Sequence, residues 1–189
     1  MKLAVKIMCA TTLSSAIALV GCAQTSTTPS QNTHDIPSSQ TATVNLVSAT
    51  GIGKKIGEIR FTDTAKGLKI ETNLSQLPPG PHGFHVHENP SCDPAEKDGK
   101  AGAALAAGSH LNTNQAKNHG TPLTGHLGDL PLLQVQTDGT AKVTLIAPRL
   151  KVADVKDRAV MIHAGGDNYS DDPKPLGGGG DRIACAIVY

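Results

Sequence analysis

The feature that most restricts how this chain can fold is a series of short segments in which apolar and polar residues alternate. Alternation with a period of two sends successive side chains to opposite faces of an extended strand, so that one face can be buried. Thr, Val and Ile recur in these segments, and turn signals such as Pro78-Pro79-Gly80 and Asp138-Gly139 separate them. The segments that we expect to be strands are Thr43–Val47, Lys55–Phe61, Leu68–Leu74, His82–Glu88, Ala141–Ala147, Ala159–Ala164 and Ile183–Val188.

No segment shows a sustained helical period, which favours an all-β fold over a mixed one. The chain has two Phe, two Tyr and no Trp, so its core must consist mainly of aliphatic side chains. We therefore expect one domain at 41–189, built as an antiparallel β-sandwich or barrel.

The first 21 residues have the pattern of a secretory signal: Lys2 and Lys6 precede an apolar run at 7–20. This run is too short, and too rich in Thr and Ser, to suit a membrane-spanning helix. It ends in Leu19-Val20-Gly21-Cys22, which resembles the bacterial lipobox, where cleavage before the Cys leaves that residue lipidated. An ordinary signal with a chance cysteine is the alternative. With a lipobox, Ala23 after Cys22 favours the outer membrane, so we expect a periplasmic protein that is anchored there by lipid.

The segment 22–40 is rich in Thr, Ser, Pro, Gln and Asn, and this composition predicts a flexible tether. Loss of the signal lowers Lys+Arg from 17 to 15 while Asp+Glu stays at 16, so the mature net charge is near −1. This charge argues against a nucleic-acid partner. Cys92 and Cys185 are the two cysteines that remain in the domain, and an even pair in an exported protein predicts one disulfide.

A long loop follows the expected strand His82–Glu88: more than 40 residues pass before the next convincing strand. A loop of this length inside a compact domain requires a reason. The loop carries His110, His119, His126 and Asp129, which match the ligands of a four-coordinate zinc site. Metal binding would order the loop where an apolar core cannot. The alternative is a loop that is simply polar, and three imidazoles together with a carboxylate disfavour it.

Three more histidines lie in expected strands. His85 and His87 are two residues apart, so their rings point to the same face, and the apolar residues between them point into the core. Taken alone, they would be interpreted as surface histidines on a polar face. His163 faces away from its apolar neighbour Ile162, so it can complete a second metal site with the first two.

Taken in order, these residues resemble the copper–zinc superoxide dismutases. The similarity rests on Gly83–Glu88, His110, His119, His126–Asp129, His163 and Gly177–Cys185, and it covers 41–189 in order and spacing. The signal, the Cys92–His110 loop and the run Leu176–Gly180 resemble the bacterial periplasmic branch. The resemblance implies a Greek-key, immunoglobulin-like antiparallel sandwich or flattened barrel of about eight strands with long metal-binding loops. It also implies an oxidoreductase that converts superoxide, its substrate, to oxygen and hydrogen peroxide.

The resemblance further implies a role for each matching residue. Copper takes His85, His87, His110 and His163, and zinc takes His110, His119, His126 and Asp129. His110 then bridges both metals as imidazolate and is catalytic together with Arg182, the family's arginine beside the copper. All-imidazole coordination suits copper, whereas a carboxylate among imidazoles suits zinc. Cys92 and Cys185 match the family disulfide, and His82 matches a structural histidine.

Several roles remain open at this level. Asp167 is the expected carboxylate that joins ligand histidines of the two metals, although Asp171 and Asp172 lie close by. Lys97 and Lys100 either steer an anionic substrate or are simply solvated. A copper-buffering protein without turnover, or a structural domain with zinc only, would have lost a copper ligand or the arginine, and neither is lost. The sequence leaves open an accessory ligand such as haem, and a homodimer as well as a monomer.

Overall fold

The computed structural model describes residues 38–189. The predicted signal, Cys22 and most of the predicted tether therefore lie outside the described residues. The elements within them are β1 (Ser39–Ser48), β2 (Gly51–Thr64), β3 (Gly67–Leu74), β4 (Gly80–His82), β5 (Phe84–His87), β6 (Ala95–Lys97), β7 (Lys100–Gly102), the 3₁₀ helix η1 (Leu105–Ala107), β8 (Leu133–Val135), β9 (Thr144–Ala147), α1 (Val152–Val155), β10 (Arg158–His163), the 3₁₀ helix η2 (Leu176–Gly178) and β11 (Arg182–Val188). No helix among them is both long and apolar enough to span a membrane.

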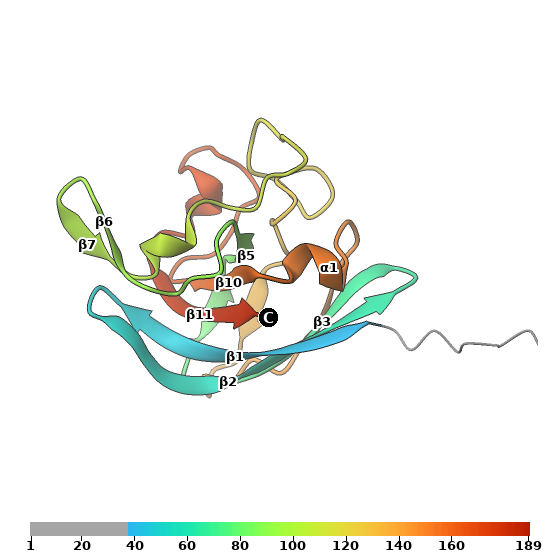
Figure 1. Ribbon diagram of the computed structural model, residues 1–189, viewed down its shortest axis with the longest axis horizontal. Helices are drawn as coiled ribbons and strands as arrows, with labels where there is room; N and C mark the ends of the chain where they lie inside the picture. The colour runs from blue at the N-terminus through green and yellow to red at the C-terminus, as the bar shows by residue number, and fades with distance from the viewer. Residues whose placement is uncertain (1–37) are drawn as a thin grey trace, which may run out of the picture. The chain divides into compact units, whose positions relative to one another are not determined.

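Seven strands form one antiparallel sheet in the order β5-β10-β11-β1-β2-β3-β9. The sheet is curled, with β1 and β2 on one side and the long loops gathered on the other (Figure 1). β9 and β10 follow each other along the chain but lie near opposite edges of the sheet. The connection between them, which contains α1, therefore crosses over from one edge to the other. This crossover is typical of a Greek key. The predicted all-β, antiparallel fold is confirmed.

The hydrophobic core fills the inside of the curl, and alternation along the strands explains its membership. In β2, Ile59 and Phe61 are buried, whereas Arg60 between them is exposed. Each fully buried large side chain contributes about 1.5–3 kcal/mol to stability. The largest fully buried members of this core are Phe61, Phe84, Ile59, Leu68, Ile70, Leu74, Leu130, Leu133, Leu150 and Ile162.

The structure differs from the predicted strands in several places; the predicted strand Ala141–Ala147, for example, is β9 only from Thr144. β1 begins at Ser39 rather than Thr43, because Ser39 and Gln40 already pair with β2. The predicted strand His82–Glu88 breaks at Gly83, where a side chain would press on the ring of His85 at 3.1 Å. The long loop also contains the small hairpin β6–β7, so residues 38–189 hold eleven strands rather than about eight.

Both faces of β5 are buried, and its outer face carries histidines of the predicted metal site. Phe84 and Val86 point into the core, as expected, whereas His85 and His87 point to the outer face of the sheet. In the register with β10, His85 lies opposite Met161 and His87 lies opposite Ala159. The long loop after β5 and the loop after β10 cover this outer face, so the histidines are buried beneath loops rather than exposed to solvent.

Candidate metal centre

Four imidazoles meet on the outer face of β5 and β10. His85 and His87 come from β5, His163 comes from the end of β10, and His110 forms an isolated β-bridge with His87. One ring nitrogen of each lies within 4.8 Å of the others, and all four residues are buried. The structure thus brings together the four predicted copper ligands, three from strands and one from the long loop.

A second cluster surrounds the carboxylate of Asp129. Asp129 Oδ1 lies 3.0 Å from His110 Nδ1 and 3.5 Å from His126 Nδ1, while Oδ2 lies 3.1 Å from His119 Nδ1. Three of the predicted zinc ligands, His110, His119 and Asp129, have ligand atoms within 4.8 Å of one another, and His85 belongs to the same group. His126 faces Asp129 but lies outside that group. His110 belongs to both clusters, since its Nδ1 faces Asp129 and its ring stacks on that of His85 with centroids 4.0 Å apart.

The hydrogen bonding of the rings tests whether these residues fit metals. Among the described residues, the buried side-chain nitrogens and oxygens that have no hydrogen-bond partner are all imidazole nitrogens of this site. A buried polar atom without a partner costs about 1–3 kcal/mol, so a cluster of them indicates atoms that are reserved for ligands. These atoms are His85 Nδ1, His87 Nε2, His110 Nε2, His119 Nδ1, His126 Nδ1 and His163 Nε2.

The opposite nitrogen of most of these rings is held by the protein. His87 Nδ1 contacts the Gly108 carbonyl at 3.0 Å, and His163 Nδ1 contacts the Gly180 carbonyl at 3.1 Å. Because a carbonyl can only accept, each of these nitrogens carries the N–H, and the other nitrogen keeps a lone pair for a metal. The donor set fits the pair of metals: imidazole lone pairs in one cluster, and imidazoles with a carboxylate in the other.

Asp167 joins the two clusters. Its Oδ2 accepts a hydrogen bond from His85 Nε2 at 2.8 Å, and its Oδ1 accepts one from His119 Nε2 at 2.8 Å. Asp171 instead accepts from the backbone N–H of His119 and of Leu176, and the structure shows no imidazole contact for it. Asp172 is exposed. Of the three aspartates considered from the sequence, Asp167 is the one that holds rings of both clusters.

Burial and charge set the protonation of the site before any metal is considered. Burial lowers the pKa of His85 to about 3 and that of His163 to about 4, so both rings are neutral at pH 7. Burial alone would raise the pKa of Asp129 and of Asp167, but hydrogen bonds from histidines hold both well below their usual range. Burial disfavours the charged form of His119 as well, yet the two carboxylates raise its pKa to about 9. If His119 Nδ1 binds a metal, as predicted, binding would release a proton.

Arg182 lies at the start of β11, beside the copper-ligand cluster. Its guanidinium donates to the carbonyl of Ala104 at 2.5 Å and to that of Gly108 at 2.6 Å. It lines a cavity of about 420 Å³ together with His87, His110 and His163. Both acceptors are neutral carbonyls, so these bonds fix the guanidinium without neutralising its charge. The arrangement offers a positive group to a small anion in the cavity.

Comparison with known proteins identifies the family. Residues 55–188 match the family model described as copper/zinc superoxide dismutase (SODC). The chain belongs to this family. The Cu-Zn superoxide dismutase of Escherichia coli K12 is 54% identical over 152 residues, which cover 79% of this chain and 88% of that protein.

Solved structures agree with the copper/zinc superoxide dismutase family. The Cu/Zn superoxide dismutase from Brucella abortus is similar with a TM-score of 0.79 and 48% identity, covering 80% of this chain and 100% of that one. The solution structure of the monomeric copper, zinc superoxide dismutase from Salmonella enterica is similar with a TM-score of 0.72 and 54% identity, with the same two shares. The predicted enzyme class and the predicted use of copper and zinc are confirmed.

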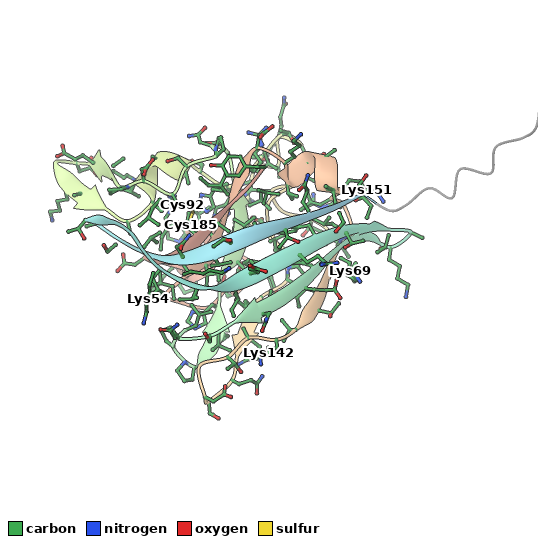
Figure 2. The ribbon with its side chains drawn as sticks, turned by 60° about the horizontal axis from the view of Figure 1, so that its bottom comes forward. Lys54, Lys69, Cys92, Lys142, Lys151 and Cys185 are labelled. Carbon is green, nitrogen blue, oxygen red and sulfur yellow. A yellow bond between two sulfur atoms is a disulfide. The ribbon has the colours of Figure 1, made fainter. Side chains whose placement is uncertain are left out.

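The predicted disulfide is present in this superoxide dismutase domain. Cys92 and Cys185 are bonded, with their Cα atoms 5.8 Å apart, and they lie together beside β1 (Figure 2). The bond ties the start of the long loop to β11, which also carries Arg182. The disulfide therefore connects the arginine's strand to the loop whose carbonyls the guanidinium contacts.

The two lysines of the β6–β7 hairpin differ in position. Lys97 lines the cavity that contains Arg182 and three histidines, whereas Lys100 lines an adjoining hollow of about 720 Å³. Lys97 and Arg182 line that hollow as well, so the two spaces adjoin at these residues. The position is compatible with a role in attracting an anion, most directly for Lys97.

Some contributors to the site left no signal in the sequence. The Gly108 carbonyl accepts from both His87 and Arg182, and backbone atoms are invisible to a search for side-chain motifs. Arg149 donates to two carbonyls of the loop that carries His126, although it belongs to no motif. His82 is buried with its ring nitrogens at the carbonyls of Pro78 and His163, so it is structural, as its family match implied.

Proposed function

We propose that this protein disproportionates superoxide to oxygen and hydrogen peroxide at a copper–zinc site that His110 bridges, outside the cytoplasm. The observation that carries the proposal is the set of buried imidazole nitrogens without partners, most of which lie in two overlapping groups that share His85 and His110. Family membership supplies the reaction, and the cavity beside Arg182 supplies a place for a small anion.

The proposed division of ligands follows from donor chemistry. Copper would be held by His85, His87, His110 and His163, all imidazoles, and zinc by His110, His119, His126 and Asp129. His110 suits a bridge because its Nε2 has no partner in the protein, while its Nδ1 faces the carboxylate of the other cluster. A single carboxylate distinguishes the two sites, and the preference of zinc for mixed nitrogen and oxygen ligands assigns it to the cluster around Asp129.

Copper, when bound, would supply the electron exchange between two superoxide ions. The chain itself would do the rest. Arg182 would bind and orient the superoxide anion in the cavity, and its two carbonyl contacts keep it in place between turnovers. His110 would hold a proton at Nε2 whenever that atom is not a ligand, and deliver it to the forming peroxide. Asp167 would keep His85 and His119 oriented throughout.

We also propose that the enzyme is exported and attached to the outer membrane through lipid on Cys22. The signal pattern at 1–21, the Leu19–Cys22 motif and the polar composition of 22–40 support this. Mass analysis of the N-terminal peptide from membrane fractions tests it directly: a lipid-modified Cys22 at the new N-terminus is expected. The proposed anchor is contradicted if the protein is found in the soluble fraction with an unmodified N-terminus at another position.

Our proposal for the oligomeric state is based on one relative. The Salmonella enterica protein is described as monomeric. We propose a monomer for the domain at 41–189, with a homodimer as the outcome that light scattering would reveal by a doubled mass.

The experiment for the activity is reconstitution. The purified protein is loaded with copper and zinc, the content of both metals is measured, and superoxide consumption is followed. Activity that requires copper is expected. Full occupancy by both metals without superoxide consumption would support a metal-buffering protein instead.

A further inference from the structure

Arg149 lies outside both metal clusters, in a turn that follows the edge strand β9 (Thr144–Ala147). It follows β9 and Pro148, and its neighbours Ala147 and Leu150 are buried in the core. The Leu150 N–H donates to the Ala147 carbonyl at 3.3 Å, which closes the turn around Arg149. The backbone of Arg149 is therefore anchored to the edge strand of the sheet that lies farthest from β5 in strand order.

The side chain of Arg149 reaches the loop that carries His126. Its Nε donates to the Pro122 carbonyl at 2.6 Å, and its Nη2 donates to the His126 carbonyl at 2.7 Å. The same segment forms a tight turn, in which the N–H groups of Thr124 and Gly125 both donate to the Thr121 carbonyl at 3.0 Å. The planar guanidinium thus bonds to one carbonyl within the turn, that of Pro122, and to one just after it, that of His126.

His126 needs such support more than the other ligands do. The ring of His119 is fixed by Asp167, and those of His87 and His163 are fixed by loop carbonyls. His126 is held through its backbone instead. Its N–H donates to Asp129 Oδ2 at 2.9 Å, and its carbonyl accepts from the Asp129 N–H at 3.2 Å as well as from Arg149.

The turn before His126 is also open to solvent. Leu123 at its tip is 67% exposed, and the side chain of His126 is 12% exposed, whereas those of His119 and Asp129 are fully buried. An exposed turn opens more easily than a packed one, so a fixed external donor has most effect here. The His126 carbonyl accepts hydrogen bonds from both the Arg149 guanidinium and the Asp129 N–H.

We propose that Arg149 is a positioning residue for the zinc site, which sets zinc retention by fixing the backbone of His126 against Asp129. This inference rests on the proposed division of ligands. Arg149 acts through backbone carbonyls and touches neither metal nor substrate. Its effect should therefore be large on zinc and small on copper, whose proposed ligands do not include His126.

The test replaces Arg149 by Met, which removes both donors but keeps a long apolar stem, and by Lys, which keeps the charge without the planar fork. Arg60→Met is the matched control, because Arg60 is an exposed arginine on the outer face of β2. The zinc dissociation constant is measured by competition with a chelator, and the copper dissociation constant in parallel. The absorption spectrum of Co²⁺ bound in place of zinc reports the ligand geometry.

We expect Arg149→Met to weaken zinc binding roughly 10–100-fold, with an altered Co²⁺ spectrum, while Arg149→Lys gives a smaller loss and Arg60→Met none. Copper affinity and the thermal unfolding of the metal-free protein should change little. The proposal is overturned if Arg149→Met leaves zinc affinity unchanged. It is equally overturned if both metals and the metal-free fold are weakened alike, since that is the result of a purely structural contact.

A further variant separates this inference from the proposed ligand set. His126→Ala should weaken zinc binding at least as strongly as Arg149→Met. If it does so and Arg149→Met has no effect, only the positioning role fails. If His126→Ala itself leaves zinc affinity unchanged, the assignment of His126 as a ligand fails, and the role of Arg149 fails with it.

Discussion

The replacement Asp167→Asn tests how far one carboxylate organises both metal sites. Asp167 accepts from His85 Nε2 and from His119 Nε2, each at 2.8 Å, and from the Tyr169 N–H at 2.7 Å. Asn has nearly the same shape but only one accepting oxygen. Its amide group must therefore face one of the two imidazole N–H groups, and two donors would then oppose each other.

The affected ring can relieve this repulsion in two ways, and both weaken metal binding. It can rotate away, or it can move its proton to Nδ1, the atom that the structure leaves without a partner in both rings. A proton there blocks metal binding. Loss of such an orienting contact typically costs 10–100-fold in metal affinity, which corresponds to about 1.4–2.8 kcal/mol. The unpaired buried N–H adds about 1–3 kcal/mol to the cost of folding.

Chelator competition at pH 7 measures the dissociation constants of zinc and copper for both proteins. We expect weaker copper binding if the amide faces His85 and weaker zinc binding if it faces His119. The first is favoured, because an Asn oxygen at the Oδ1 position keeps both the His119 and the Tyr169 donors. Asp172→Asn, at an exposed position five residues away, is the control. The reasoning is refuted if Asp167→Asn binds both metals as tightly as the unmodified protein.

Three further predictions concern other parts of the site. His163→Ala should abolish superoxide consumption while zinc binding stays largely intact, and loss of zinc in this variant would contradict the division of ligands. Replacing both Lys97 and Lys100 by Gln should lower the rate constant at low ionic strength and flatten its salt dependence, and an unchanged rate with unchanged salt dependence would show that the lysines are merely solvated. The metal-free protein should lose stability as pH falls below about 6.5. Burial lowers the pKa of His85 to about 3 and that of His163 to about 4, so below pH 6.5 these histidines bind protons in the unfolded chain but not in the folded one. Each such histidine contributes at most about 1.4 kcal/mol per pH unit in that range, and urea titrations between pH 5 and 7 that show flat or rising stability on acidification would contradict this.

The strands were predictable from the sequence wherever alternation was undisturbed. Ile59 and Phe61 in β2 are buried and alternate with exposed neighbours, and this alternation can be read from the sequence. The prediction failed at Gly83, where the chain passes from β4, which pairs with β8, to β5, which pairs with β10. This change of partner strand depends on residues far along the chain, and no local pattern reports it.

The metal ligands were predictable for a different reason. Histidines in a loop that lacks any apolar pattern stand out by residue type, and the order of His110, His119, His126 and Asp129 resembles a known family. Their supports were harder to find, because they act through backbone carbonyls. Gly108 and Arg149 hold the site without any residue type or spacing that marks them.

The central claim is that the two clusters around His110 hold copper and zinc and consume superoxide. The most direct measurement is superoxide consumption by the purified protein at defined metal content, before and after selective removal of copper. We predict activity that is proportional to bound copper, disappears when copper is removed and returns when copper is restored. Stoichiometric binding of both metals without superoxide consumption would contradict the account.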